Sequence, residues 1–159
     1  MKKIFVLALS LISLNALANE VRIHVQLSPA GSFQAVSEKV TGRAARKDGM
    51  IRANRIFVPI DSFKTEMDLR DEHFKKHLKM ADHPRAIVSR LIGKDGKANA
   101  VLEVAGVKKP IAITYKENGK KIKAQFSVKA SDFELSKAQY MGVGVEDQVK
   151  VEVEFEVSE

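Results

Sequence analysis

The sequence predicts an all-β domain, an antiparallel barrel or sandwich of eight strands with one α-helix near 69–81. Three observations lead to this fold class. Eight segments alternate apolar and polar residues with period 2. The links between them are short and rich in turn formers, including Asp-Gly and Asn-Gly pairs. A single stretch changes to helical spacing.

The first eighteen residues have the pattern of a secretory leader. Lys2 and Lys3 precede an apolar run over 4–14, and Ala16-Leu17-Ala18 is a small-x-small cleavage site. The apolar run is shorter than the about 20 residues of a membrane span, and no Cys follows it for a lipoprotein anchor. We therefore expect cleavage after Ala18, export to the periplasm, and one domain over 19–159.

Charge and cysteine content exclude two classes of protein. The formal net charge of +7 falls to +5 without Lys2 and Lys3, and the other basic residues are interleaved with acids. Nucleic-acid binding needs clustered basic residues with stacking aromatics, so no nucleic acid is expected. The chain has no Cys, so its stability must come from the core without disulfides.

Strand candidates run through the whole chain after residue 19. The clearest alternation is at 121–130 and 149–157, where lysines on one outer face are expected to pair with glutamates on the other. The weaker candidates lie at 20–27, 33–42, 55–60, 86–92, 99–107 and 110–117. The turn formers SPAG, RKDG, GKDG and ENGK lie between them.

The helix is predicted by apolar residues at helical spacing. Leu69, Phe74, Leu78 and Ala81 share one face, acids lie near the expected N-terminus, and Pro84 cannot continue the helix.

Two histidines on this helix raise the question of a metal site. His73 and His77 are four residues apart, the spacing by which two imidazoles can bind one zinc ion. Candidate third ligands are His83, Asp82 and Glu72. Because Lys75 and Lys76 lie between the two histidines, we expect no metal and an ordinary solvent-facing surface.

No motif indicates catalysis, and no cofactor is expected. The chain lacks a Cys nucleophile and a G-x-S-x-G elbow. Gly142-Val143-Gly144 is expected to be a loop, and 93–100 a hairpin turn. Arg70 and Asp71 point in different directions on a helix, so each is expected to reach its own partner, in a structural role or in a ligand contact.

Five runs of the chain carry a family signature: 62–65, 70–74, His83-Pro84, VAGVKKPI at 104–111 and SDFEL at 131–135. Together they resemble the signature of the YceI-like family of exported, lipid-binding, lipocalin-like proteins, with Glu66 departing from the small residue usual there. The matching signature residues are Thr65, Arg70, Asp71, Phe74 and Pro84. The resemblance implies an eight-stranded lipocalin-like barrel that holds an isoprenoid or other long-chain lipid.

The expected function is therefore a non-enzymatic periplasmic carrier, a monomer or homodimer that touches membrane surfaces transiently. The alternatives are a stress-related lipid-modifying enzyme and a structural barrel filled by its own side chains. Period 2 directs a set of residues to the barrel interior as candidate ligand contacts. They are Ile56, Val58, Ile60, Val88, Leu102, Val104, Ile113, Tyr115, Phe126, Val128, Val151, Val153 and Phe155.

Overall fold

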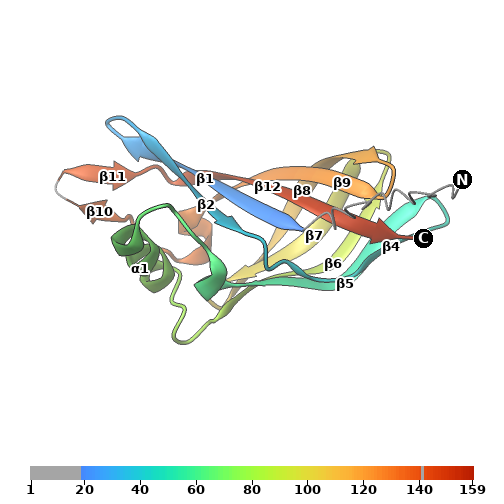
Figure 1. The fold of residues 1–159 in the computed structure, drawn as a ribbon, viewed down its shortest axis with the longest axis horizontal. Helices are drawn as coiled ribbons and strands as arrows, with labels where there is room; N and C mark the ends of the chain where they lie inside the picture. Colours follow the sequence, from blue (N-terminus) through green and yellow to red (C-terminus); the bar gives the residue numbers. More distant parts are fainter. Residues whose placement is uncertain (1–18, 141) are drawn as a thin grey trace, which may run out of the picture.

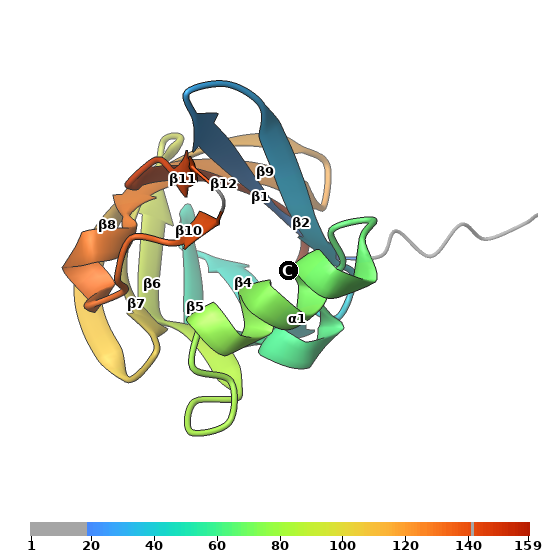
Figure 2. The same cartoon turned by 90° about the vertical axis from the view of Figure 1, so that its left-hand side faces the viewer.

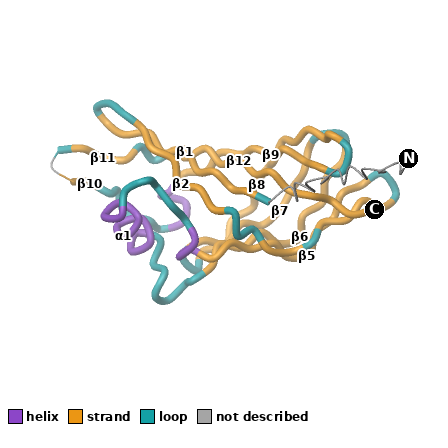
Figure 3. The backbone as a smooth tube through the Cα atoms, in the orientation of Figure 1, coloured by secondary structure: helices purple, strands orange, loops and turns teal. Residues whose placement is uncertain are grey.

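The computed structural model describes residues 19–140 and 142–159, so the predicted leader over 1–18 lies outside the described residues. A long β-barrel with one α-helix at one end forms the molecule (Figure 1 and Figure 3). In chain order the elements are β1 (Glu20–Ser28), β2 (Ser32–Ser37), β3 (Thr41–Gly42), β4 (Ala44–Lys47), β5 (Met50–Pro59), η1 (Ile60–Ser62), α1 (Asp68–His77), β6 (Arg85–Lys94), β7 (Lys97–Val104), β8 (Val107–Asn118), β9 (Lys121–Lys129), η2 (Ala130–Phe133), β10 (Gln139–Tyr140), β11 (Val143–Val145) and β12 (Gln148–Ser158).

Seven strands close the barrel, in the order β12-β4-β5-β6-β7-β8-β9, and β9 pairs back to β12. Figure 2 shows this ring from the end that carries α1 and β10. All neighbours are antiparallel except β4 and β12. The all-β barrel with one helix is confirmed, but the predicted number of eight barrel strands is wrong.

The strand count differs because one edge of β12 is shared. β1 pairs with that edge over residues 150–154, and the short β4 takes over at 157–158. At the α1 end, the space between β12 and β5 is thus filled by β1 and its partner β2, whereas at the other end it is filled by β4. β4 was not predicted because AARK shows no alternation.

The tight turns follow the predicted chemistry. Asp48-Gly49 and Asp95-Gly96 have positive φ at both residues, as a two-residue type I′ hairpin requires. They join β4 to β5 and β6 to β7, so the predicted hairpin at 93–100 is confirmed. The predicted loop at 142–144 instead contains the start of β11, which pairs with β10 and with the end of β1.

The helix is shorter than predicted and ends at His77. Lys79 adopts φ 55°, its N–H donates to Lys76 O at 3.0 Å, and the Met80 N–H donates to Lys75 O at 3.1 Å. This pair of bonds is a Schellman motif, which ends a helix at a left-handed residue. Glycine or Asn normally marks that position, so Lys79 gave no signal in the sequence.

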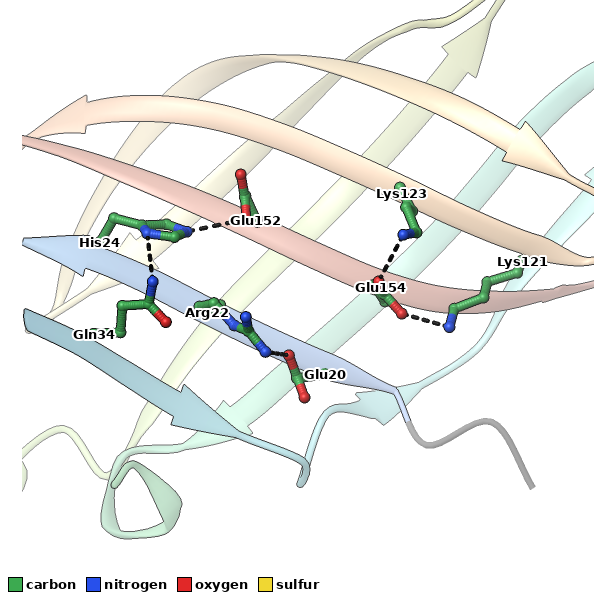
Figure 4. A network of polar contacts seen from close by, with 8 residues as sticks. All are labelled: Glu20, Arg22, His24, Gln34, Lys121, Lys123, Glu152 and Glu154. Carbon is green, nitrogen blue, oxygen red and sulfur yellow. Dashed lines mark hydrogen bonds and ion pairs between the residues drawn. The ribbon is translucent and has the colours of Figure 1, made fainter. Parts of the chain in front are cut away.

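The outer faces of β1, β9 and β12 carry a polar network (Figure 4). Glu154 on β12 pairs with Lys121 and, at 3.2 Å, with Lys123 on β9. These two lysines lower the pKa of the Glu154 carboxyl by hydrogen bonding and charge. His24 on β1 lies 3.0 Å from Glu152. The predicted pairing of basic and acidic outer faces is confirmed, so the intervening residues of these strands face inward.

Candidate ligand-binding cavity

The barrel encloses a cavity of about 940 Å³. Its wall is apolar along most of its length, because alternate residues of each barrel strand point inward. Every residue predicted to face the interior lies on this wall, namely Ile56, Val58, Ile60, Val88, Leu102, Val104, Ile113, Tyr115, Phe126, Val128, Val151, Val153 and Phe155. Their contact with a ligand remains a prediction.

The wall also contains residues that were not singled out. Val21, Ile23, Val25 and Leu27 of β1 line it at period 2, a signal that is present in the sequence. Leu91 of β6 lines it out of phase with Val88. The register of β6 against β7 shifts between Ser89 and Ile92, and Arg90 has φ 53°. A β-bulge therefore turns Leu91 inward, which period 2 alone cannot predict.

Buried side chains close the cavity at the end that carries β4. Ala44, Ile51, Tyr115, Ile122 and Val157 line it there and are all buried. The Tyr115 ring fits because its neighbour on β6 is Gly93, where an added Cβ would lie 3.0 Å from Tyr115 Cε1. Burial raises the pKa of the Tyr115 hydroxyl, so the side chain is neutral at physiological pH. Tyr115 forms part of the floor.

At the opposite end the lining reaches solvent. Met67, Leu69 and Val143 line the cavity and are 53%, 56% and 41% exposed. They come from the start of α1 and from β11, which flank the near end of the barrel in Figure 2. This end, which we call the mouth, is the route by which a ligand can enter.

The polar side chains of the described lining gather at the mouth, apart from Tyr115. Arg70, His73, Lys76 and His77 come from α1, and Gln139 comes from β10. The prediction of a solvent-facing surface holds for His73, which is exposed, but not for His77, which is half-buried, and both histidines also line the cavity. Of the predicted apolar face, Leu69, Phe74 and Leu78 line the cavity, with Leu69 exposed at the mouth, whereas Ala81 lies beyond the helix.

The family signature residues hold α1 in place. The Asp71 side chain is buried, and its Oδ1 accepts bonds from Thr65 N at 2.6 Å and from Thr65 Oγ1 at 2.7 Å. Burial raises the pKa of Asp71, but these bonds and the Lys64 ammonium outweigh it, and the pKa is lowered overall. Arg70 donates to Thr65 O at 3.3 Å and lies 4.7 Å above the Phe33 ring.

The segment before α1 is tied to β2 in turn. Val36 and Lys64 exchange two backbone hydrogen bonds of 2.9 Å, and Ser37 and Ser62 hydroxyls lie 2.6 Å apart. Phe63 is buried. It meets Phe74 of α1 edge to face, with ring centroids 5.5 Å apart. This chain of contacts fixes the inner face of the helix over the barrel end.

The remaining signature segments also meet in space. Pro84 O accepts a bond from Ile60 N at 2.8 Å. The His83 ring lies against Gly106, where an added Cβ would lie 2.5 Å from His83 Cε1 and where φ is +80°. Only glycine suits both constraints. The Ala105-Gly106 turn thus supports the segment that returns from α1 to the barrel.

The described residues contain no group of three or more His, Cys, Asp or Glu side chains arranged to hold a metal ion. Over the same residues, no helix is long and apolar enough to cross a membrane.

A family model described as the YceI-like domain matches residues 14–157. The chain belongs to the YceI-like family. No curated protein matches it significantly.

Solved structures share the YceI-like fold at low sequence identity. BcnA of Burkholderia cenocepacia is 14% identical with a TM-score of 0.65, over 86% of this chain and 94% of that one. A polyisoprenoid-binding domain from Saccharophagus degradans is 16% identical with a TM-score of 0.64, over 88% and 93%. The Campylobacter jejuni YCEI protein is 18% identical with a TM-score of 0.57, over 76% and 81%. At these identities the likeness concerns the fold.

Proposed function

We propose that this protein is a non-enzymatic carrier that holds one long-chain lipid, an isoprenoid or acyl derivative, inside its barrel. The observation that carries the proposal is the apolar cavity, closed at one end by buried side chains and open at the mouth. A solved domain of the same fold is described as polyisoprenoid-binding. Membership of the YceI-like family supports the same class of ligand.

The cavity suits a lipid tail in size and chemistry. Ligand cavities typically measure roughly 300–1,000 Å³, and this one lies near the upper end at about 940 Å³. Each buried methylene contributes about 0.8 kcal/mol. A tail of about fifteen methylenes therefore contributes roughly 12 kcal/mol before the cost of its immobilisation is subtracted. Affinity then comes mainly from the tail.

The lining supports binding over chemistry. Its described residues include no Ser, Thr, Asp or Glu, and its histidines lie at the mouth, away from the apolar wall that would surround a tail. The open volume supports a loaded barrel over one filled by its own side chains.

Organic extraction of the purified protein, followed by mass spectrometry, tests the proposal. We expect about one long-chain lipid per folded molecule. Protein stripped of lipid should then take up a prenyl alcohol or a fatty acid and displace a fluorescent fatty-acid probe. Stripped, folded protein that binds none of these ligands would exclude the carrier. Consumption of the extracted lipid by the protein would instead indicate an enzyme.

We also propose that the carrier works in the periplasm after cleavage behind Ala18. The charged, apolar and small-residue regions of 1–18 support this location. Cell fractionation combined with N-terminal sequencing should find the protein in the periplasmic fraction, starting at Asn19. An uncleaved cytoplasmic protein would contradict the proposal.

A further inference from the structure

The helix α1 places none of its acidic side chains on the cavity lining. Among the described lining of the mouth, the ionisable side chains are Arg70, His73, Lys76 and His77 of α1. The acids of the same helix lie elsewhere: Asp71 is buried against Thr65, and neither Asp68 nor Glu72 lines the cavity. The mouth is therefore cationic although the helix as a whole carries both signs. We call Arg70, His73, Lys76 and His77, together with Gln139 on β10, the basic rim.

The members of the basic rim are suited to bind an anion. One of the five N–H donors of Arg70 binds Thr65 O, and the guanidinium is held above Phe33, so the group is positioned with donors to spare. Lys76 is exposed and makes no ion pair with any described residue. Burial and the Lys79 charge lower the pKa of His77, which is thus neutral at pH 7. His77 offers hydrogen bonds without charge.

A cation at the end of an apolar cavity has a specific consequence for the ligand. The tail can only be buried below the mouth, so the polar end of a bound lipid lies at the basic rim. A neutral headgroup would leave Arg70 and Lys76 hydrated and would add little to the binding free energy of the lipid. A phosphate or carboxylate would receive charge-assisted hydrogen bonds from Arg70 and Lys76, which are about twice as strong as neutral ones.

We infer that the basic rim binds the anionic headgroup of the lipid, and that the ligand class is a long-chain phosphate or carboxylate bound tail-down. This inference rests on the proposed carrier function and adds the chemistry of the headgroup. Arg70 and Lys76 supply the charge, and His77 and Gln139 supply neutral hydrogen-bonding groups beside it.

The test compares two ligands with the same tail, geranylgeranyl monophosphate and geranylgeraniol, on lipid-stripped protein. Dissociation constants come from displacement of a fluorescent fatty-alcohol probe. The wild type should bind the phosphate at least about tenfold more tightly than the alcohol. Lys76→Gln should reduce this preference and leave the affinity for the alcohol unchanged. Arg70→Gln should do the same, provided that its melting temperature shows a folded protein.

The matched control is Lys75→Gln. Lys75 lies on the same helical turn and carries the same charge, but it does not line the cavity. This variant should keep the full preference for the phosphate. An equal loss in Lys75→Gln and Lys76→Gln would show a general effect of net charge and would overturn the inference.

Two further outcomes separate the inference from the function on which it rests. Equal affinity of the wild type for phosphate and alcohol overturns the basic rim as a headgroup site and leaves the carrier standing. Failure of both ligands and of the probe to bind overturns the carrier itself. Inorganic phosphate alone should compete only weakly. Competition as strong as that of geranylgeranyl monophosphate would assign the rim to free anions and contradict a lipid headgroup.

Discussion

Asp71 shows how one buried carboxylate can position a binding surface without touching a ligand. Its Oδ1 accepts two hydrogen bonds from Thr65, and its neighbour Arg70 donates one to Thr65 O. The sequence left open whether this pair is structural or contacts a ligand. The structure divides the roles: Asp71 is turned away from the cavity, whereas Arg70 lies on its lining.

Asp71→Ala should lower the free energy of unfolding by about 1–3 kcal/mol, because the Thr65 N–H and hydroxyl lose their acceptor. The lowered pKa of Asp71 sets the pH dependence. A depressed carboxyl pKa stabilises the protein above the unfolded value of about 3.9 and loses that contribution as pH falls through the folded value. Urea titrations at pH 7 should show the full difference from wild type, and titrations below about pH 4 a smaller one.

Glu72→Ala is the control for this prediction, because Glu72 is the next residue and is exposed. It should change stability by less than about 0.5 kcal/mol. A difference between wild type and Asp71→Ala that grows as the pH falls would contradict the assignment.

Tyr115 should set the longest tail that the barrel accepts, because its ring forms part of the floor of the cavity. Tyr115→Ala opens space there and should shift the preferred tail of a prenyl or acyl series towards longer members. Tyr115→Phe keeps the ring and should leave the preference unchanged. Gly93→Ala places a methyl group 3.0 Å from Tyr115 Cε1 and should move the ring, shifting the preference or lowering stability. The same preference in wild type and Tyr115→Ala would contradict this role.

At the scale of elements, strands were predictable because their alternation is local. The register of β12 against β9 places Val151 opposite Phe126 and Phe155 opposite Ile122, so two patterns read separately agree on one interior. The turns at Asp48-Gly49 and Asp95-Gly96 were predictable because few residues tolerate positive φ.

Other features depend on contacts that the sequence does not display. Lys79 at the end of α1 and Arg90 in the bulge of β6 both have positive φ. Gly or Asn would have marked these positions in the sequence, but Lys and Arg do not. Glu66, the departure from the family pattern, is a third such residue, with φ 67°. The closure of the ring through β4 depends on pairing with a strand over a hundred residues away. The basic side chains on the inner face of α1 were not predicted, because that face was assigned only from the spacing of the apolar residues.

The two faces of β12 give a paired test of the interior. Val153 lines the cavity, whereas Glu154 joins the outer network with Lys121 and Lys123. Val153→Glu places a carboxylate in an apolar lumen, at a cost of several kcal/mol of lost hydration, so folding or lipid loading should fail.

Glu154→Val removes only exposed ion pairs, each worth about 0–1 kcal/mol, and should retain the lipid. Lipid content by mass spectrometry and the melting temperature measure both effects. Loss of loading in Glu154→Val with normal loading in Val153→Glu would show that inside and outside are reversed.

At the scale of the whole molecule, exposed large apolar side chains gather where the cavity opens. Met67, Leu69 and Val143 all line the mouth, and Ile92 lies away from it. The transient contact with membranes expected from the sequence stays a prediction, and this placement suits it, because exposed apolar groups beside cations favour a lipid surface.

Met67→Ser together with Leu69→Ser should slow uptake of lipid from anionic vesicles and leave the affinity for a detergent-dispersed lipid unchanged. Ile92→Ser removes an apolar side chain of similar exposure and should have no effect on uptake. Stopped-flow transfer of a fluorescent lipid measures the rates. If Ile92→Ser slowed uptake equally, the apolar side chains of the mouth would have no specific role in lipid transfer.

Among the described residues, the buried side chains of Ala44, Ile51, Tyr115, Ile122 and Val157 form a floor and leave the mouth as the opening of the barrel. An incoming lipid and the bound lipid must use the same opening, so the incoming lipid cannot enter while the bound lipid occupies the cavity. Exchange between two lipids must therefore pass through an empty barrel. The rate at which a labelled lipid leaves is then a property of the loaded protein alone, and raising the concentration of a competing lipid should not accelerate it.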